Sequence, residues 1–248
     1  MSDLIPRYVA GQFHAPTGSA LFEHRNPSDV GDVVSRFSPA TAAEVSEAVA
    51  AASAAAPGWR ATTGPARADA LYKWGEAIAA RSEVLAQAIT REVGKPIGEA
   101  RGEVGRAVVI CRYYAGEAVR ESGEVIPSQA PDALQFTMRD PLGPVALVTP
   151  WNFPLAIPLW KAAPALAFGN TVLLKPSEHA AGMAYALAEC AAAAGLPAGV
   201  FNVLPGDGAT GEALLRHEGV RGISFTGSQA VGARVAAIGA ERNVRAQT

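Results

Sequence analysis

Beyond Pro141 the chain alternates short apolar segments with longer helical segments, and this alternation limits the fold more than any other feature. Strands and helices in this order predict right-handed crossovers and therefore a parallel sheet covered by helices, an α/β fold. Pro158 and Pro164 should kink or split the first crossover helix, because a proline inside a helix costs about 3 kcal/mol. The expected strands are Val145 to Val148, Thr171 to Leu174, Val200 to Val203 and Gly222 to Phe225, and the expected helices are Leu155 to Phe168, His179 to Ala194, Gly211 to His217 and Gln229 to Ile238.

The part of the chain before residue 123 is predicted to be helical after a short extended beginning. Extended segments are expected at Tyr8 to Phe13 and at Asp32 to Phe37, where apolar residues lie between turn formers. Thr41 and Glu44 have the T-x-x-E spacing of a capping box, and helical patterns with one apolar face continue from there to Ala118. We expect these helices to cover the sheet.

The segment from Glu124 to Met138 breaks the helical pattern. Its sequence, EVIPSQAPDALQFTM, predicts an extended hairpin or arm with its turn near Pro131 and Asp132. An arm of this kind can pair with another subunit, so a homo-oligomer is expected for the full-length protein.

Charge and cysteine content exclude several classes of function. The 248 residues carry 21 basic and 23 acidic side chains without a basic block, so nucleic acid is not an expected partner. Cys111 and Cys190 are too few for a disulfide framework, and the first residues, MSDLIPRY, lack the apolar core of a signal peptide. We therefore expect a cytoplasmic protein, and the histidines have no ligand spacing that predicts a metal site.

The segment from Leu142 to Trp160 carries no charge over about the length that a membrane span needs. Its prolines would leave several backbone carbonyls without donors in lipid, which a spanning helix rarely tolerates. A buried core segment is therefore the preferred interpretation, and no membrane partner is expected.

In a parallel α/β sheet, ligands bind outside the carboxyl ends of the strands, so the residues that follow each strand carry the functional prediction. If the sheet forms as predicted, these loops converge on one ligand. They are Thr149 to Asn152, Lys175 to Glu178, Pro205 to Gly211 and Thr226 to Gly232.

The last three loops have the chemistry of a dinucleotide site, although each also has a simpler structural explanation. The sequence GDGATG at Gly206 to Gly211 satisfies G-x-G-x-x-G, but the acidic residue expected about 20 positions later is missing. Lys175 and Glu178 could hold a ribose, or they could begin a solvated helix with Ser177 as its N-cap. The free amides and the Ser228 hydroxyl suit a phosphate, or they simply cap a helix.

Taken together, TPWNFPLAIPLWKAAPALAFGNTVLLKPSE, GDGATG and SFTGSQAVG resemble the first half of the cofactor-binding domain of the NAD(P)-dependent aldehyde dehydrogenases, which has a Rossmann-like sheet. The segments YYAGEA and GEVIPS are similar to those of semialdehyde dehydrogenases. The resemblance covers essentially the whole chain and implies a truncated fold without the catalytic domain. It implies the N-terminal part of the cofactor-binding domain at 1–122, an oligomerisation arm at 123–141 and a Rossmann-like NAD(P)-binding part at 142–248.

The resemblance implies that the full-length enzyme oxidises a small aldehyde to a carboxylic acid with NAD or NADP. In such enzymes a cysteine thiolate attacks the aldehyde, the thiohemiacetal passes a hydride to the nicotinamide, and a glutamate activates water. Asn152 corresponds to the asparagine whose amide donates to the developing oxyanion, although by itself it could be a turn asparagine. Lys161 resembles a lysine that supports the site, or it snorkels from the core.

The resemblance also implies where the cofactor binds. Glu178 should favour NAD, because a carboxylate repels a 2′-phosphate at close range. The similar semialdehyde dehydrogenases nevertheless often accept NADP, so both remain expected. The implied contacts are Thr149, Pro150 and Trp151 along the channel, Lys175, Ser177 and Glu178 at the adenosine ribose, Gly208 at the adenine, and Gly227 with Ser228 at the pyrophosphate.

The glutamate and the nucleophilic cysteine that the resemblance requires would lie beyond Thr248. Cys111 and Cys190 lie in apolar helical segments, which predict inert thiols. Three hypotheses remain: an aldehyde dehydrogenase whose other half is missing from this sequence, a short protein that binds a dinucleotide without catalysis, and an interaction protein that docks on full-length subunits through the arm.

Overall fold

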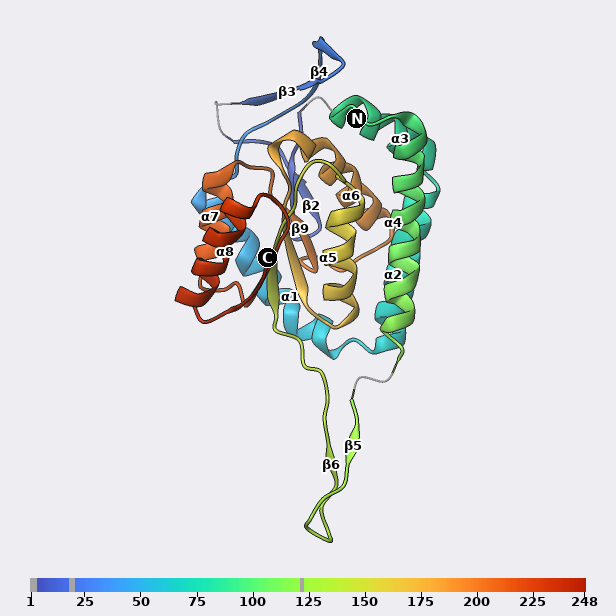
Figure 1. The fold of residues 1–248 in the computed structure, drawn as a ribbon, viewed down its shortest axis with the longest axis vertical. Coiled ribbons are helices and arrows are strands. Elements are labelled where there is room, and N and C mark those ends of the chain that lie inside the picture. The colour runs from blue at the N-terminus through green and yellow to red at the C-terminus, as the bar shows by residue number, and fades with distance from the viewer. Residues whose placement is uncertain (1–3, 18–20, 121–122) are drawn as a thin grey trace.

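The computed structural model describes residues 4–17, 21–120 and 123–248, and a seven-stranded sheet lies at the centre of this part of the chain (Figure 1). The strands follow the order β11-β10-β7-β8-β9-β1-β2. Strands β11 to β9 are parallel, whereas β1 pairs antiparallel with β9 and with β2. The strands are β1 (Arg7–Val9), β2 (Gln12–His14), β7 (Pro144–Val148), β8 (Thr171–Lys175), β9 (Phe201–Val203), β10 (Gly222–Phe225) and β11 (Arg245–Gln247).

This sheet confirms the predicted α/β fold and the predicted parallel strands. Three of these strands differ from the predicted bounds by one residue at one end: β7 begins at Pro144, β8 extends to Lys175 and β9 begins at Phe201. Strand β11 was not predicted, because its exposed residues Arg245–Gln247 do not form an apolar run. The antiparallel addition of β1 and β2 was not predicted either, since their sequence shows an extended conformation but not its partner.

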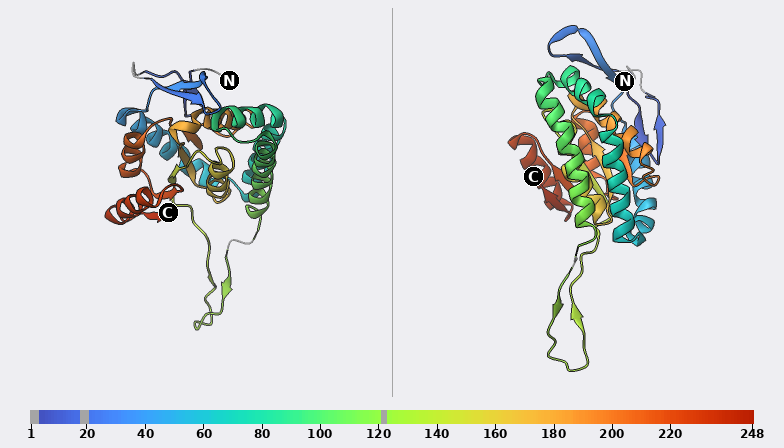
Figure 2. Two further views of the ribbon diagram at one scale, coloured as in Figure 1. Left: turned by 45° about the horizontal axis from the view of Figure 1, so that its top comes forward. Right: turned by 90° about the vertical axis from the view of Figure 1, so that its right-hand side faces the viewer.

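Helices cover both faces of the sheet (Figure 1, Figure 2). Successive strand residues enter opposite cores: Val172 and Leu174 pack with α2 to α6, and Leu173 packs with α1, α7 and α8. This alternation explains why the central strands are apolar throughout. The helices are α1 (Ala42–Ala61), α2 (Gly64–Ala79), α3 (Ser82–Val93), α4 (Ile97–Glu117), α5 (Ala156–Ala167), α6 (Ala181–Ala193), α7 (Gly208–Arg216) and α8 (Gln229–Glu241).

Two predictions about helices need correction. The prolines were predicted to kink or split the first crossover helix, and they do not split it, because α5 is one continuous helix. Pro158 lies in the first turn, where a backbone N–H has no partner within the helix, and Pro164 is accommodated in the interior. Helix α7 begins at Gly208 rather than Gly211, because Asp207 Oδ1 accepts hydrogen bonds from the amides of Ala209 (2.9 Å) and Thr210 (3.1 Å).

Several smaller predictions are confirmed. The capping box of α1 is present, with the Glu44 amide donating to Thr41 Oγ1 (3.3 Å) and the Thr41 amide donating to Glu44 Oε2 (2.8 Å). The predicted extended segment before it belongs to the hairpin of β3 (Phe22–Asn26) and β4 (Asp29–Phe37). Cys111 and Cys190 are helical and buried. No helix among the described residues is both long and apolar enough to cross a membrane.

The predicted arm is present as a hairpin that projects away from the body of the molecule (Figure 1, Figure 2). It contains β5 (Val125–Ile126) and β6 (Gln135–Phe136), and its chain turns at Pro131 and Asp132 as predicted. The predicted boundary at residue 122 falls on 121–122, which lie outside the described residues. The side chains of Val125, Leu134, Phe136 and Met138 are exposed on the arm.

Two buried glutamates cap the helices that follow the central strands. Glu92 on α3 accepts hydrogen bonds from the amides of Gly182 (2.7 Å) and Met183 (2.9 Å) at the start of α6. Glu103 on α4 does the same for the amides of Leu155 (2.9 Å) and Ala156 (3.1 Å) at the start of α5. Each carboxyl group therefore satisfies two amides that a helix start leaves without partners.

Glu92 predicts an unusual dependence of stability on pH. Burial raises the pKa of Glu92 to about 8 and outweighs the two amide hydrogen bonds, which lower it. The folded chain therefore keeps a proton that the unfolded chain releases above about pH 4.3. Its stabilising contribution is present below that pH and is lost as the pH rises through about 8.

The expected result is that the free energy of unfolding in urea falls between pH 5 and pH 8, and that Glu92→Gln removes most of this slope. Glutamine keeps the shape of the side chain but does not titrate. Equal slopes for the two proteins would contradict the raised pKa.

Candidate functional site

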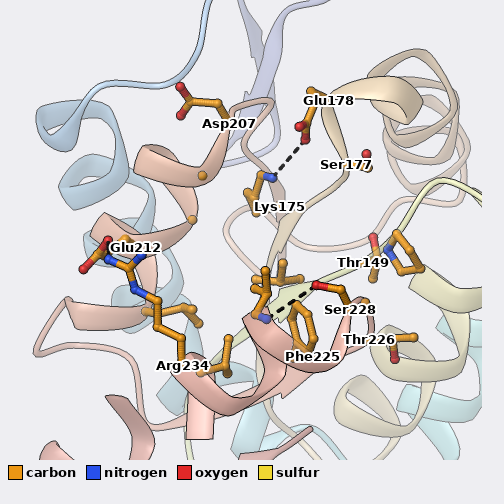
Figure 3. Close-up of a pocket in the computed structure, with 18 of the residues that line it drawn as sticks. Thr149, Lys175, Ser177, Glu178, Asp207, Glu212, Phe225, Thr226, Ser228 and Arg234 are labelled. Carbon is orange, nitrogen blue, oxygen red and sulfur yellow. Dashed lines mark hydrogen bonds and ion pairs between the residues drawn. The ribbon is translucent and has the colours of Figure 1, made fainter. Parts of the chain in front are cut away.

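The predicted cofactor residues all line one cavity of about 390 Å³ at the carboxyl edge of the parallel strands (Figure 3). The cavity lies beside β7, where the chain first crosses to β8 and β9 and later returns to form β10 on the other side. Such a reversal of strand order opens a crevice between the loops, and ligands of α/β proteins bind there. The residues brought together are Thr149, Pro150, Trp151, Lys175, Ser177, Glu178, Gly208, Gly227 and Ser228.

Lys175 provides a buried cation at one end of the cavity. It follows the apolar run of β8, is only 6% exposed, and its Nζ lies 3.8 Å from Glu178 Oε2. Burial lowers the pKa of Lys175, and the charges of Glu178 and Asp207 act in the opposite direction. Because 3.8 Å is too long for a good hydrogen bond, the ammonium retains donors for a ligand.

The serines of the cavity are both helix caps, as their simpler explanation predicted. Ser177 Oγ accepts from the amide of His179 (3.3 Å) at the short 3₁₀ turn Glu178–Ala180, and Ser228 Oγ accepts from the amide of Val231 (3.4 Å) at the start of α8. Both residues also line the cavity, so capping and ligand contact are compatible. The start of α8 thus presents amides where an anion is stabilised.

Thr149 contributes a polar group without a partner. The residue is 3% exposed, and within the described part of the chain its hydroxyl has no hydrogen-bond partner. A buried hydroxyl without a partner costs roughly 1–3 kcal/mol, which a ligand can recover. Its position on the cavity wall, on the side of Ser177 and Ser228, is visible in Figure 3.

The glycines of the GDGATG motif have different roles. A Cβ at Gly206 would lie 2.4 Å from Thr210 Cβ, so the first glycine allows tight packing of the loop on α7. A Cβ at Gly208 would meet no atom of the described residues within 4 Å, so this position opens to the cavity. Gly227 is constrained by packing, because a Cβ there would lie 2.5 Å from the ring of Phe225.

The sequence did not predict the wall that α7 and α8 form. Apolar side chains of Leu215, Val231, Val235 and Ile238 line it, together with the pair Glu212 and Arg234. These residues look like ordinary positions of covering helices, since the strand-end rule directs attention only to loops. The one available signal was that both helices start in predicted ligand loops.

Asn152 directly follows Trp151, which lines the cavity, but Asn152 itself does not line it. It is exposed, and no hydrogen bond of its side chain occurs within the described residues. The loop that carries it is fixed from below: Glu103 binds the amides that follow, and Lys95, which pairs with Glu103, lies 3.8 Å from the ring centroid of Phe153. The Asn152 side-chain amide is therefore free to bind a ligand, while the residues that follow it hold the loop in place.

Lys161 also lies outside the cavity. From α5 it donates to Ser224 Oγ (2.7 Å) and to the carbonyl of Phe225 (3.2 Å) on β10, and burial lowers its pKa to about 8. It therefore ties the helix after β7 to the neighbouring strand, instead of only snorkelling from the core. Among the described residues, no group of three His, Cys, Asp or Glu side chains could hold a metal ion.

The parallel sheet, its strand reversal and this cavity define an α/β protein with a cavity at the carboxyl ends of its strands, where proteins of this class bind their ligands. The chain belongs to the aldehyde dehydrogenase family, whose family model matches residues 13–248. It is 45% identical over 226 residues to the alpha-ketoglutaric semialdehyde dehydrogenase of Bacillus subtilis, a match that covers 91% of this chain and 46% of the relative.

Solved structures agree with this membership. The crystal structure of an NAD-dependent aldehyde dehydrogenase from Sinorhizobium meliloti matches 98% of this chain and 49% of that chain, with a TM-score of 0.94 and 37% identity. An NADP-dependent enzyme from E. coli matches with a TM-score of 0.94 and 36% identity, over 98% of this chain and 50% of that one. The chain therefore spans about half the length of the relatives it matches.

Proposed function

We propose that this chain forms the dinucleotide-binding half of an aldehyde dehydrogenase, and that the complete enzyme oxidises a small aldehyde to a carboxylic acid with NAD or NADP. The observation that carries the proposal is the single cavity of about 390 Å³ that all the predicted cofactor residues line. Its volume lies in the range of about 300–1,000 Å³ that small-molecule sites occupy. The partnerless Thr149 hydroxyl and the buried Lys175 ammonium fit a polyhydroxylated ligand.

Each part of the dinucleotide is assigned to the cavity residues whose chemistry suits it. Lys175 and Glu178, with Ser177, bind the adenosine ribose, since an ammonium donates to a hydroxyl and a carboxylate accepts from one. The adenine extends past Gly208, and the pyrophosphate meets the start of α8 at Gly227 and Ser228. Glu178 favours NAD over NADP by charge, because its carboxylate repels a 2′-phosphate.

In the complete enzyme the bound cofactor supplies a hydride acceptor. Thr149, Pro150 and Trp151 guide it along the channel after β7, and the Asn152 amide donates to the oxyanion that develops on the aldehyde. Burial raises the pKa of Cys111 to about 12 and also raises that of Cys190, so neither thiol serves as the nucleophile. The nucleophilic thiolate and the glutamate that activates water belong to the other half of the enzyme.

The exposed apolar side chains of the arm support assembly into a homo-oligomer, because such side chains are stabilised when a second subunit covers them. We assign residues 123–141 to this role, 1–122 to the N-terminal part of the cofactor-binding domain and 142–248 to its NAD(P)-binding part. The semialdehyde in the name of the Bacillus subtilis relative favours a substrate of that class. The two buried, unpaired cysteines are consistent with a reducing compartment, the cytoplasm.

The cofactor site lies within this chain, so NADH binding tests the proposal directly. The expected result is saturable NADH binding, followed by fluorescence, and a Kd about 10-fold to 100-fold higher for Lys175→Ala. Losing hydrogen bonds from a charged donor costs roughly 1.5–3 kcal/mol. Lys73→Ala is the matched control, because Lys73 is an exposed helical lysine paired with Asp69 away from the cavity. A chain that does not bind NADH, or equal affinities for all three proteins, would contradict the proposed cofactor site.

A further inference from the structure

One end of the cavity is apolar and lies between α7 and α8. Leu215 on α7 and Val231, Val235 and Ile238 on α8 line it, and Lys175 and Glu178 lie at the polar end. Apolar walls beside a polar, ribose-binding end match a nucleoside, whose base is flat and largely apolar and whose sugar carries hydroxyls. The base therefore enters between the two helices.

A pair of charges spans this apolar end. Arg234 on α8 donates from Nη2 to Glu212 Oε2 on α7 (2.5 Å), and both residues line the cavity. Figure 3 shows the Arg234 side chain extending toward Glu212 along the cavity wall. Glu212 is held in turn by Arg216, whose Nε donates to Glu212 Oε1 (3.0 Å). Arg216 does not line the cavity, so only one of the two arginines can reach a ligand there.

We infer that Arg234 is a binding residue that stacks the face of its guanidinium on the adenine ring, an inference that rests on the proposed dinucleotide site. Its Nη2 is engaged by Glu212, which leaves the flat face of the group for a ligand. A planar guanidinium stacks well on aromatic rings, and this contact tolerates any base with a π-face. Arg234 thus adds a stacking surface beside the apolar residues that α8 contributes to the base slot.

The position of Arg234 argues against a contact with phosphate. It lies six residues after Ser228, which is about 9 Å along a helix, so it is distant from the amides that receive the pyrophosphate. The Glu212 carboxylate beside it repels a phosphate group. Stacking on the base therefore fits the surroundings of Arg234 better than an ion pair with the 2′-phosphate of NADP.

The test measures binding of NADH, NADPH and 5′-AMP to the intact chain and to Arg234→Ala, Arg234→Lys and Arg216→Ala. Arg234 is 64% exposed, so its variants should fold, and circular dichroism checks this. Arg234→Ala is expected to weaken all three ligands by about threefold to thirtyfold, the range of cation–π contacts. Arg234→Lys should weaken binding nearly as much as Arg234→Ala, because lysine keeps the positive charge but lacks the planar guanidinium that stacks on the base. Arg216→Ala should stay within about twofold of the intact chain, because its side chain does not reach the ligand.

Three outcomes would overturn the inference: unchanged binding in Arg234→Ala, full retention in Arg234→Lys, or a loss confined to NADPH, which indicates a phosphate contact. An intact chain that binds none of the three ligands would instead refute the proposed dinucleotide site, and this inference with it. Because 5′-AMP contains only the adenosine end, its binding separates a failure at the base slot from a failure elsewhere in the cavity.

Discussion

Replacing Glu103 by Ala is expected to lower the free energy of unfolding by about 3–5 kcal/mol, the usual cost of removing one partner from a buried ion pair. The Glu103 side chain is fully buried and that of Lys95 is 10% exposed, so the substitution leaves a cation with little access to water. It also leaves the amides of Leu155 and Ala156 without their acceptor. Since native domains are stable by only about 5–15 kcal/mol, urea unfolding should show a large shift of the midpoint.

Two variants control this measurement. Glu99→Ala removes an exposed carboxylate from the same helix and should change stability by less than about 0.5 kcal/mol. The double variant Glu103→Ala with Lys95→Met should recover part of the loss, because it also removes the unpaired charge. If Glu103→Ala unfolds at the same urea concentration as Glu99→Ala, the carboxylate does not support α5.

Glu103 also illustrates what the sequence could not reveal. It contacts amides that lie 52 and 53 residues further along the chain, and Glu92 reaches 90 and 91 residues further. Glu92 lies three residues after Ile89 and Glu103 three residues after Ala100, so both occupy the apolar face of their helices, but the sequence does not show which groups they contact there. Only tertiary packing turns them into buried caps, so local patterns identify the helices but not the groups that anchor them.

The strands of the parallel sheet could be predicted, because each is a short apolar run between turn formers. This signal lies within a few neighbouring residues and needs no knowledge of the pairing. The short strand β1 could not be placed, since it pairs with β9, which lies far away in the chain, and β11 could not be recognised, since its exposed residues form no apolar run. The cavity followed from one general rule, that ligands lie at the carboxyl ends of parallel strands. The rule identified loop residues and missed Arg234, which lies within a helix.

Replacing Asn152 by Ala is expected to slow aldehyde oxidation by about 100-fold to 1,000-fold, the usual effect of removing one oxyanion donor. The measurement needs the half of the enzyme that this chain does not cover. A chimera in which this chain replaces the matching 46% of the Bacillus subtilis relative supplies it, because the two are 45% identical over 226 residues. The rate is followed as NADH formation with saturating aldehyde and NAD, and the unsubstituted chimera must first be active.

The outcome separates a catalytic amide from a structural one. Asn152 does not line the cofactor cavity, so Asn152→Ala should leave the Kd for NADH unchanged while kcat falls. Asn152→Asp should be at least as slow, because a carboxylate of the same shape repels the oxyanion instead of donating to it. If Asn152→Ala keeps the full rate, the residue only shapes the turn. If it weakens NADH binding and kcat together, the substitution has disturbed the loop that Glu103 holds, and the amide has no separate role in the reaction.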